Sequence, residues 1–140
     1  MSLNTTQARD EVHALFKLAW DAGAPGIPLL YWDTAQVIPT TGAWARITMK
    51  HVVSGQTTLS GETGQRRFTR TGVITVQIFT PTGDGNVNAD LLANVAKNAF
   101  EGVHSPGDIW FRDVTVTEVG QEGAWFQTNV TAAFIYDEVR

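Results

Sequence analysis

The sequence predicts an α+β domain in which two α-helices pack against a mostly antiparallel β-sheet, in the order α-β-β-β-α-β-β. Two segments repeat apolar residues at helical spacing, and several others alternate apolar with polar residues, as strands with one buried face do. Glycine, proline, asparagine and aspartate separate these segments. With 140 residues, the chain has the length of one domain, and we expect that domain to span residues 1–140.

The first helix is predicted over Thr6–Asp21. Its apolar stripe has a period of three to four residues. The stripe consists of Ala8, Val12, Leu15, Phe16 and Ala19. Thr5 or Thr6 is the expected N-cap, with acidic residues in the opening turns, and the glycines and prolines from Gly23 onward end the helix.

Two strands are predicted next, a short one over Leu29–Trp32 and a longer one over Ala43–Val53, with a turn near Pro39 between them. In the longer strand an apolar face alternates with a cationic face. The apolar face is formed by Ala45, Ile47 and Met49, and the opposite face by Trp44, Arg46, Thr48 and Lys50.

A long mobile loop is expected over Ser54–Gln65, because Leu59 is its only large apolar residue. Loops of this length inside a compact domain are usually functional. A third strand is predicted from Phe68 to Pro81, where proline ends the hydrogen-bond ladder.

The second helix is predicted over Asn88–Glu101, with Asn88 as its N-cap and Gly102 as its C-cap. Two strands follow it, over Ile109–Val119 and Trp125–Tyr136, joined by a tight polar turn. The alternation of the first of these strands changes phase near Arg112 and Asp113, which predicts a β-bulge at that place.

Little in the sequence points to catalysis. The chain has no cysteine, and its three histidines have no chemical partner close in sequence. The segment Asp84–Asp90 resembles the start of a calcium loop, but Ala89 and Val95 occupy the positions that require glycine and glutamate. No glycine-rich phosphate-binding motif is present. We therefore expect no catalytic residue, no cofactor and no metal site.

Charge is distributed unevenly along the sequence. Between Ala43 and Thr71, five basic residues stand against one acidic residue, whereas residues 101–140 carry seven acidic and two basic residues. Such segregation suits head-to-tail association of identical chains, although two solvated faces would give the same pattern. The expected interface residues are Arg46, Lys50, Arg66, Arg67 and Arg70, with Trp44 and Trp125 as aromatic anchors.

Two other kinds of partner are not expected. The basic loop has no interleaved aromatic residues and the chain as a whole is acidic, which argues against specific binding of nucleic acid. No apolar run approaches the roughly 20 residues that a membrane-spanning helix needs, so we expect no association with a membrane.

The order of these motifs resembles the phage tail terminator family, the tail-completion (minor tail) proteins of siphophage type. The resemblance covers nearly the whole chain. It is carried by Trp44-Ala-Arg46, by the run from Gln65-Arg-Arg67-Phe to Pro81-x-Gly83-x-Gly85, by Phe100-Glu-Gly102, by Val116-x-Glu118-Val-Gly120, and by Gly123-x-Trp125-Phe-Gln127 followed by Phe134-x-Tyr136.

The resemblance implies a structural role without enzymatic activity. It implies a homo-oligomer, a hexameric ring that ends growth of the tail tube and presents a surface for head-tail joining. The implied partners are the tail-tube protein and a head-completion or neck protein, in a virion tail assembled in the bacterial cytoplasm. The alternatives are a head-tail connector, a tail-tube subunit, or a small ligand-binding or enzymatic α+β domain.

Overall fold

The structure, a computed structural model, describes residues 3–31, 42–58, 61–84 and 86–140. Two helices and five strands follow one another in the predicted order, with one short 3-10 helix added, so the α+β class is confirmed. The elements are α1 (Thr5–Gly23), β1 (Leu29–Tyr31), β2 (Trp44–Gln56), β3 (Arg67–Pro81), η1 (Thr82–Asp84), α2 (Asn86–Phe100), β4 (Trp110–Glu122) and β5 (Trp125–Val139).

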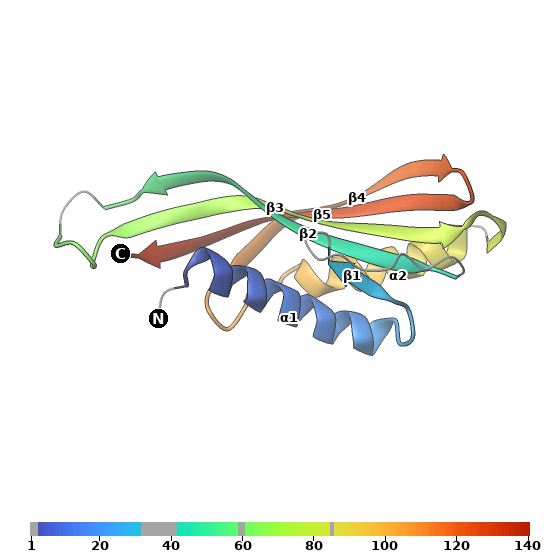
Figure 1. Cartoon of the computed structure of the whole chain (residues 1–140), viewed down its shortest axis with the longest axis horizontal. Helices are drawn as coiled ribbons and strands as arrows, with labels where there is room; N and C mark the ends of the chain where they lie inside the picture. The colour runs from blue at the N-terminus through green and yellow to red at the C-terminus, as the bar shows by residue number, and fades with distance from the viewer. Residues whose placement is uncertain (1–2, 32–41, 59–60, 85) are drawn as a thin grey trace.

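The strands form one twisted sheet in the order β1-β2-β3-β5-β4. Only β1 runs parallel to its neighbour β2, and the other pairs are antiparallel. Both helices lie on the same side of the sheet (Figure 1). The end of the β2–β3 hairpin and the C-terminal end of β5 extend beyond the N-terminal end of α1, at the left of Figure 1. We call this projecting part of the sheet the arm.

The core lies between the helices and the inner face of the sheet. Alternate residues of each strand point into it, as a period of two requires, and the rings of Phe16 on α1 and Phe100 on α2 stack with 5.3 Å between centroids. The sheet contributes Ala45, Ile47, Met49, Ile74, Val76, Ile78, Val130, Ala132, Phe134 and Tyr136, and the helices contribute Ala8, Val12, Phe16, Trp20, Leu92, Ala93, Ala96, Ala99 and Phe100.

The start of α1 differs from the prediction. The N-cap is Asn4, not Thr5 or Thr6, and the first turn holds no acidic residue. The Asn4 side chain accepts a hydrogen bond from the Gln7 amide at 2.8 Å, and the Gln7 side chain accepts one from the Asn4 amide at 3.0 Å. This reciprocal capping box satisfies two amides that otherwise lack a partner, and for this reason the helix begins one turn before its apolar stripe.

The expected long loop is shorter than predicted, because part of it is strand. β2 continues through Gln56, and the Thr57 amide donates to the Arg67 carbonyl at 2.8 Å. The Arg67 amide in turn donates to the Thr58 hydroxyl at 2.9 Å. Pairing with β3 thus makes residues 54–58 part of the hairpin, although their composition does not favour a strand. Residues 59 and 60 lie outside the described part of the chain.

Other boundaries shift by a few residues. α2 begins at Asn86 instead of Asn88, and β5 reaches Val139 instead of ending at Tyr136. Gly102 follows α2 with φ of 70°, as expected of a residue at a helix C-terminus. Trp32, the predicted end of the first strand, and the predicted turn near Pro39 lie outside the described residues.

The predicted β-bulge in β4 is confirmed. The register with β5 shifts between Arg112 and Thr115, and Asp113 adopts a φ of 55°. A second shift, between Glu118 and Gly120, was not predicted. Together the two irregularities bend the outermost strand of the sheet.

Gly72 on β3 marks the tightest packing in the sheet. A Cβ at this position would overlap the carbonyl oxygen of Lys50 and lie 2.6 Å from the ring of Phe134.

Replacing Gly72 with alanine should therefore lower the free energy of unfolding by about 3 kcal/mol, because neither the backbone nor the ring can move away. Chemical denaturation measures this loss. The matched control is Gly55→Ala on β2, where nothing lies within 4 Å; an equal loss in both variants would contradict the packing argument.

Candidate assembly surface

The residues expected to mediate assembly lie in two separate places. Trp44, Arg46 and Trp125 gather where β2 and β5 begin and β3 ends, whereas Arg66, Arg67 and Arg70 lie on the arm. Along β3, at about 3.3 Å per residue, the two places are roughly 23 to 40 Å apart, from Arg70 to the partner of Arg46 and from Arg67 to the partner of Trp44. They cannot form a single patch, and each is described in turn.

The first place is an aromatic cluster on the face of the sheet that the helices leave uncovered. The ring of Trp44 stacks on Phe79, its cross-strand partner, at 4.2 Å, and meets Trp125 edge-on at 6.2 Å. Trp44 is only 3% exposed, so its expected role as an exposed anchor is corrected: the neighbouring strands supply the rings that pack against it. Trp125 is half-buried and remains accessible.

Arg46 forms part of the same cluster. Its Nε donates a hydrogen bond to the Gln77 side-chain oxygen at 2.9 Å. Its guanidinium lies 5.8 Å from the Trp44 ring and 5.7 Å from the Phe79 ring, within cation–π range. Burial lowers the pKa of Arg46 from its ordinary value. Arg46 is thus held by its neighbours in the sheet and is not a freely extended cation.

On the arm, Arg70 is paired within its own chain. Its guanidinium donates two hydrogen bonds to one oxygen of Glu138, at 2.8 and 3.1 Å, and lies 5.3 Å from the Phe68 ring. The two charged side chains are only 16% and 13% exposed. Arg70, which was expected at an interface, is thus engaged within its own chain, and its contact with a neighbouring subunit stays a prediction. The reason for the ion pair is the pairing of β3 with β5, which places the acidic end of the chain beside the basic segment.

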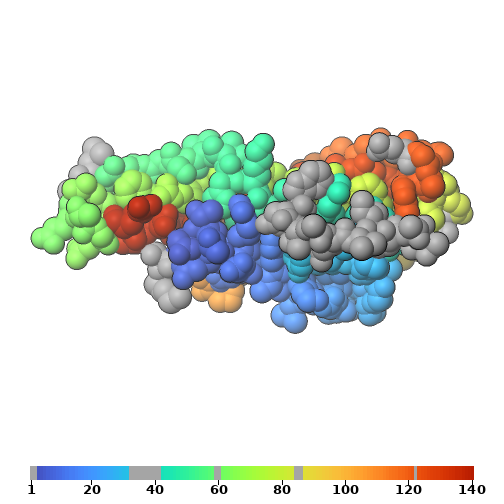
Figure 2. Space-filling view, viewed as in Figure 1, coloured from blue at the N-terminus to red at the C-terminus, as the bar shows by residue number. Residues whose placement is uncertain are grey.

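The remaining basic residues of the arm are more accessible. Arg67 lies 3.7 Å from Asp137 in an ion pair whose side chains are 55% and 42% exposed. Arg66 is half-buried and donates to the Gly61 carbonyl at 3.1 Å. Lys50, which lies nearer the middle of the sheet, opposite Val73, is exposed. Figure 2 shows the end of β5 lying against the start of β3 on this arm. The charge segregation seen along the sequence is thus partly neutralised in space.

Beneath the arm lies a polar pair that sequence reasoning missed. His51 on β2 and Tyr136 on β5 are joined by a hydrogen bond of 2.8 Å between Nε2 and the hydroxyl. Burial, followed by the charges of Arg9 and Arg70, lowers the pKa of His51. Burial also raises the pKa of Tyr136. Residues 85 positions apart meet here, so no local motif could have revealed the contact.

Trp110 is a second residue that the sequence did not single out. Among the described tryptophans, it is the one with a largely exposed side chain, at 53%. Its ring stacks on the ring of His104, with 4.4 Å between centroids. The alternation of the strand could have predicted its exposure, because Trp110 lies between the buried residues Ile109 and Phe111. An aromatic residue between two buried neighbours on a strand faces outward.

Among the described residues, no group of three or more histidine, aspartate or glutamate side chains could hold a metal ion. The groups with shifted pKa values near the sheet are Arg46, His51 and Tyr136, and each shift has burial as its largest cause. No helix of the described segments is both long and apolar enough to cross a membrane.

Comparison with known proteins decides the family. The model of a family described as phage tail terminator protein matches residues 11–134. The chain belongs to the phage tail terminator family. Membership makes this terminator a structural component of a phage tail and points to a role other than catalysis. It also implies contact with other tail proteins.

Solved structures support the terminator's fold. One of those that match is 20% identical, with a TM-score of 0.62 over 94% of this chain and 95% of the other chain. At this identity the likeness concerns the fold alone. No protein in the curated set that was compared matches the terminator.

The burial of the Arg70–Glu138 pair predicts a difference between two neighbouring arginines. Arg70→Ala leaves the Glu138 carboxylate largely buried without its partner and should lower the free energy of unfolding by about 2 kcal/mol. Arg67→Ala removes an exposed pair and should cost less than about 1 kcal/mol. Urea denaturation of both variants tests this. Equal losses would mean that burial does not set the strength of the two pairs.

His51 should make the terminator's stability depend on pH. Its pKa in the folded chain lies below the value of about 6.5 in the unfolded chain, so the unfolded chain binds more protons between the two values. The free energy of unfolding should be fully retained above about pH 6.5 and should fall as the pH drops through this interval. Denaturation between pH 5 and pH 8 measures the slope, which His51→Gln should reduce. An NMR titration placing the His51 pKa above 6.5 would refute the argument.

Proposed function

We propose that the terminator assembles into a closed hexameric ring that caps the tail tube, ends its polymerisation and provides the surface on which head-tail joining takes place. The ring would be part of the virion tail and would be assembled in the cytoplasm of the bacterial host. Its partners would be the tail-tube protein on one side and a head-completion or neck protein on the other.

The observation that carries this proposal, beside family membership, is that exposed cations lie on the β2–β3 side of the sheet and exposed carboxylates on the edge strand β4. On the β2–β3 side, Lys50 and Arg67 are exposed cations. On β4, at the other edge, Glu118 and Asp113 are exposed carboxylates, and Asp113 lies 3.8 Å from Arg112 in an exposed ion pair. A surface with opposite charges on opposite edges favours head-to-tail contacts, which form a ring when the rotation between subunits closes.

Affinity for the tube end would come from multivalency. Each contact between exposed ion pairs is weak in water, at most about 1 kcal/mol. A ring that engages a tube through several equivalent contacts binds far more tightly than one subunit, because every contact after the first is intramolecular. A ring held together by modest surface charge would therefore still bind a tube end tightly.

Imaging separates this proposal from its alternatives. Negative-stain electron microscopy with size-exclusion chromatography should give discrete six-fold rings for a terminator. Long tubes would indicate a tail-tube subunit. A chain that stays monomeric at high concentration and does not bind tube ends would count against assembly and in favour of a ligand-binding domain.

Charge reversal on the arm should abolish association without unfolding the chain. Arg66→Glu with Arg67→Glu places two negative charges on the exposed arm, where they repel the acidic edge of a neighbour. The matched control is Lys17→Glu with Lys97→Glu, which changes net charge equally on the two helices, away from both charged sides of the sheet. We expect rings from the control only, with similar melting temperatures for both variants. Rings from both would exclude the arm from the interface.

Salt gives an independent measure of the same interface. Exposed charges are screened within about 8 Å at physiological ionic strength and within about 3 Å at 1 M salt. The ring should therefore dissociate as sodium chloride is raised, and sedimentation velocity would follow the loss. A ring indifferent to salt would show that apolar contacts dominate.

A further inference from the structure

The sheet has a free edge on β5, next to the place where β4 begins. β4 pairs with β5 from Trp110, opposite Ile135, to the far end of the hairpin. β5 itself continues to Val139, so residues 136–139 have β3 on one side and no strand on the other within the described chain. A strand that is unpaired on one side presents backbone donors and acceptors to any chain that can lie beside it.

The hydrogen bonds at the end of the ladder identify the free groups. The Arg140 amide donates to the Arg66 carbonyl at 2.8 Å, and the Arg66 amide donates to the Arg140 carbonyl at 3.2 Å. In an antiparallel ladder, such mutually bonded pairs alternate with pairs whose backbone groups point the other way. Asp137 and Val139 are therefore the residues whose amides and carbonyls point away from β3, toward the free edge.

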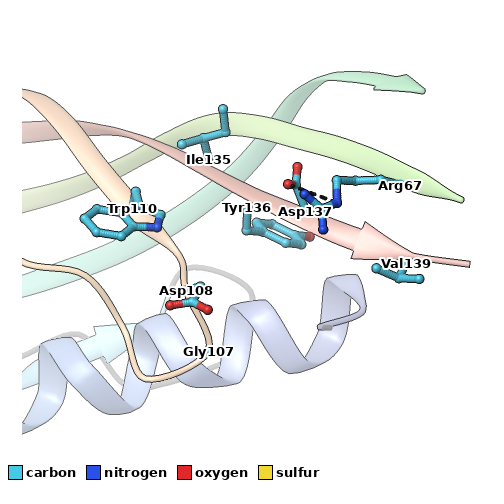
Figure 3. Close-up of a pocket in the computed structure, with 8 residues that line it drawn as sticks. All are labelled: Arg67, Gly107, Asp108, Trp110, Ile135, Tyr136, Asp137 and Val139. Atoms are coloured by element: carbon cyan, nitrogen blue, oxygen red, sulfur yellow. Dashed lines mark ion pairs between the residues drawn. The ribbon is translucent and has the colours of Figure 1, made fainter. Parts of the chain in front are cut away.

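An open groove runs along this edge, with a volume of about 810 Å³. Asp137 and Val139 line it, together with the side chains of Trp110 and Ile135 (Figure 3). The groove thus combines unpaired backbone with an exposed apolar surface. This combination is what the addition of an extended peptide to a sheet requires: main-chain bonds for affinity and side-chain pockets for specificity.

A hydrogen-bonded loop forms the other wall of the groove. Gly107 and Asp108 line the groove, and the Gly107 amide donates to the Glu11 carboxylate on α1. The Asp108 amide donates to the Ser105 carbonyl at 3.0 Å. Among the described residues the Asp108 carboxylate has no ion pair, whereas Asp137 is paired with Arg67. The uncompensated charge of the groove is therefore negative and sits on Asp108.

The other free edges of the sheet, on β2 and along the outermost strand β4, are less suited to strand addition. β4 is interrupted by two register shifts, between Arg112 and Thr115 and between Glu118 and Gly120. Beyond its short pairing with β1, β2 carries the exposed Lys50 and a register shift between His51 and Val53. Lysine and a β-bulge are the two features that most often protect a strand edge from pairing. The β5 edge from residue 136 to residue 139 has neither feature.

We propose that the free edge of β5 is a docking site for an extended segment of a partner protein, which adds to the sheet as a strand beside Asp137 and Val139. The segment places an apolar side chain against Trp110 and Ile135 and a basic side chain near Asp108. A second copy of this chain, pairing edge to edge through its own β5, is disfavoured because it brings the Asp108 carboxylates of both copies together, and neither has an ion pair among the described residues. The site does not depend on ring closure.

The test uses a synthetic probe, an acetylated and amidated six-residue peptide of alternating threonine and valine with one lysine. NMR amide shifts should change at residues 107–110 and 135–139 on titration to millimolar peptide. Hydrogen exchange of the Asp137 and Val139 amides should slow. A peptide with glutamate in place of lysine should bind up to about fivefold more weakly, the range of an exposed ion pair. Shift changes confined to other parts of the sheet would overturn the proposal.

Two variants make the test specific to the edge. Val139→Pro removes a donor that faces the groove without removing a β3 hydrogen bond, so it should abolish binding, whereas Val139→Ala should preserve it. Trp110→Ala, at an exposed position, should weaken binding about tenfold, the effect of losing an aromatic anchor. Wild-type binding by Val139→Pro and Trp110→Ala would refute the site. Imaging of the wild-type chain keeps the two proposals apart: wild-type rings without peptide binding contradict the docking site alone, and peptide binding without rings contradicts the ring alone.

Discussion

The pairing of β3 with β5 is the interaction on which the rest of this structure depends. It is an antiparallel ladder with continuous register from Arg67 opposite Val139 to Pro81 opposite Trp125. Its inner face carries Ile74, Val76 and Ile78 beside Val130 and Phe134, and the helices pack on this face. Because burial of apolar area is the main favourable term in folding, this face both holds the sheet to the helices and sets the register of the neighbouring strands.

The same ladder decides which charges the terminator offers to other molecules. It places Asp137 and Glu138, from the C-terminal part of the chain, beside the basic residues of the arm. Arg70 forms a largely buried ion pair with Glu138, and Arg67 forms an exposed one with Asp137. A buried pair holds its members in place, and an exposed pair exchanges partners readily in water. The arm therefore has one ion pair that is held in place, Arg70 with Glu138, and one exposed ion pair, Arg67 with Asp137, whose members can change partners.

The sheet offers assembly surfaces of two different kinds. Charged side chains at the β2–β3 side and on β4 suit contacts that are screened by salt and reversible. The free backbone of β5, flanked by Trp110 and the Asp108 loop, suits directional hydrogen bonding to one extended segment. Both surfaces are left uncovered because the two helices occupy only the inner face of the sheet. A tail protein that must contact its own copies and at least one other protein has use for surfaces that do not overlap.

The sequence by itself determined the order of the elements, the buried face of each strand and the β-bulge near Asp113, because periodicity and turn chemistry are local properties. Only the tertiary structure decided that Trp44 is buried, that Arg70 is paired and that the β2–β3 hairpin extends to Thr58. Each of these depends on a partner from a strand that alternation cannot identify: Phe79 for Trp44, Glu138 for Arg70 and Arg67 for Thr57. A period of two states which face a side chain occupies, whereas its exposure depends on what the neighbouring strand brings to the same face.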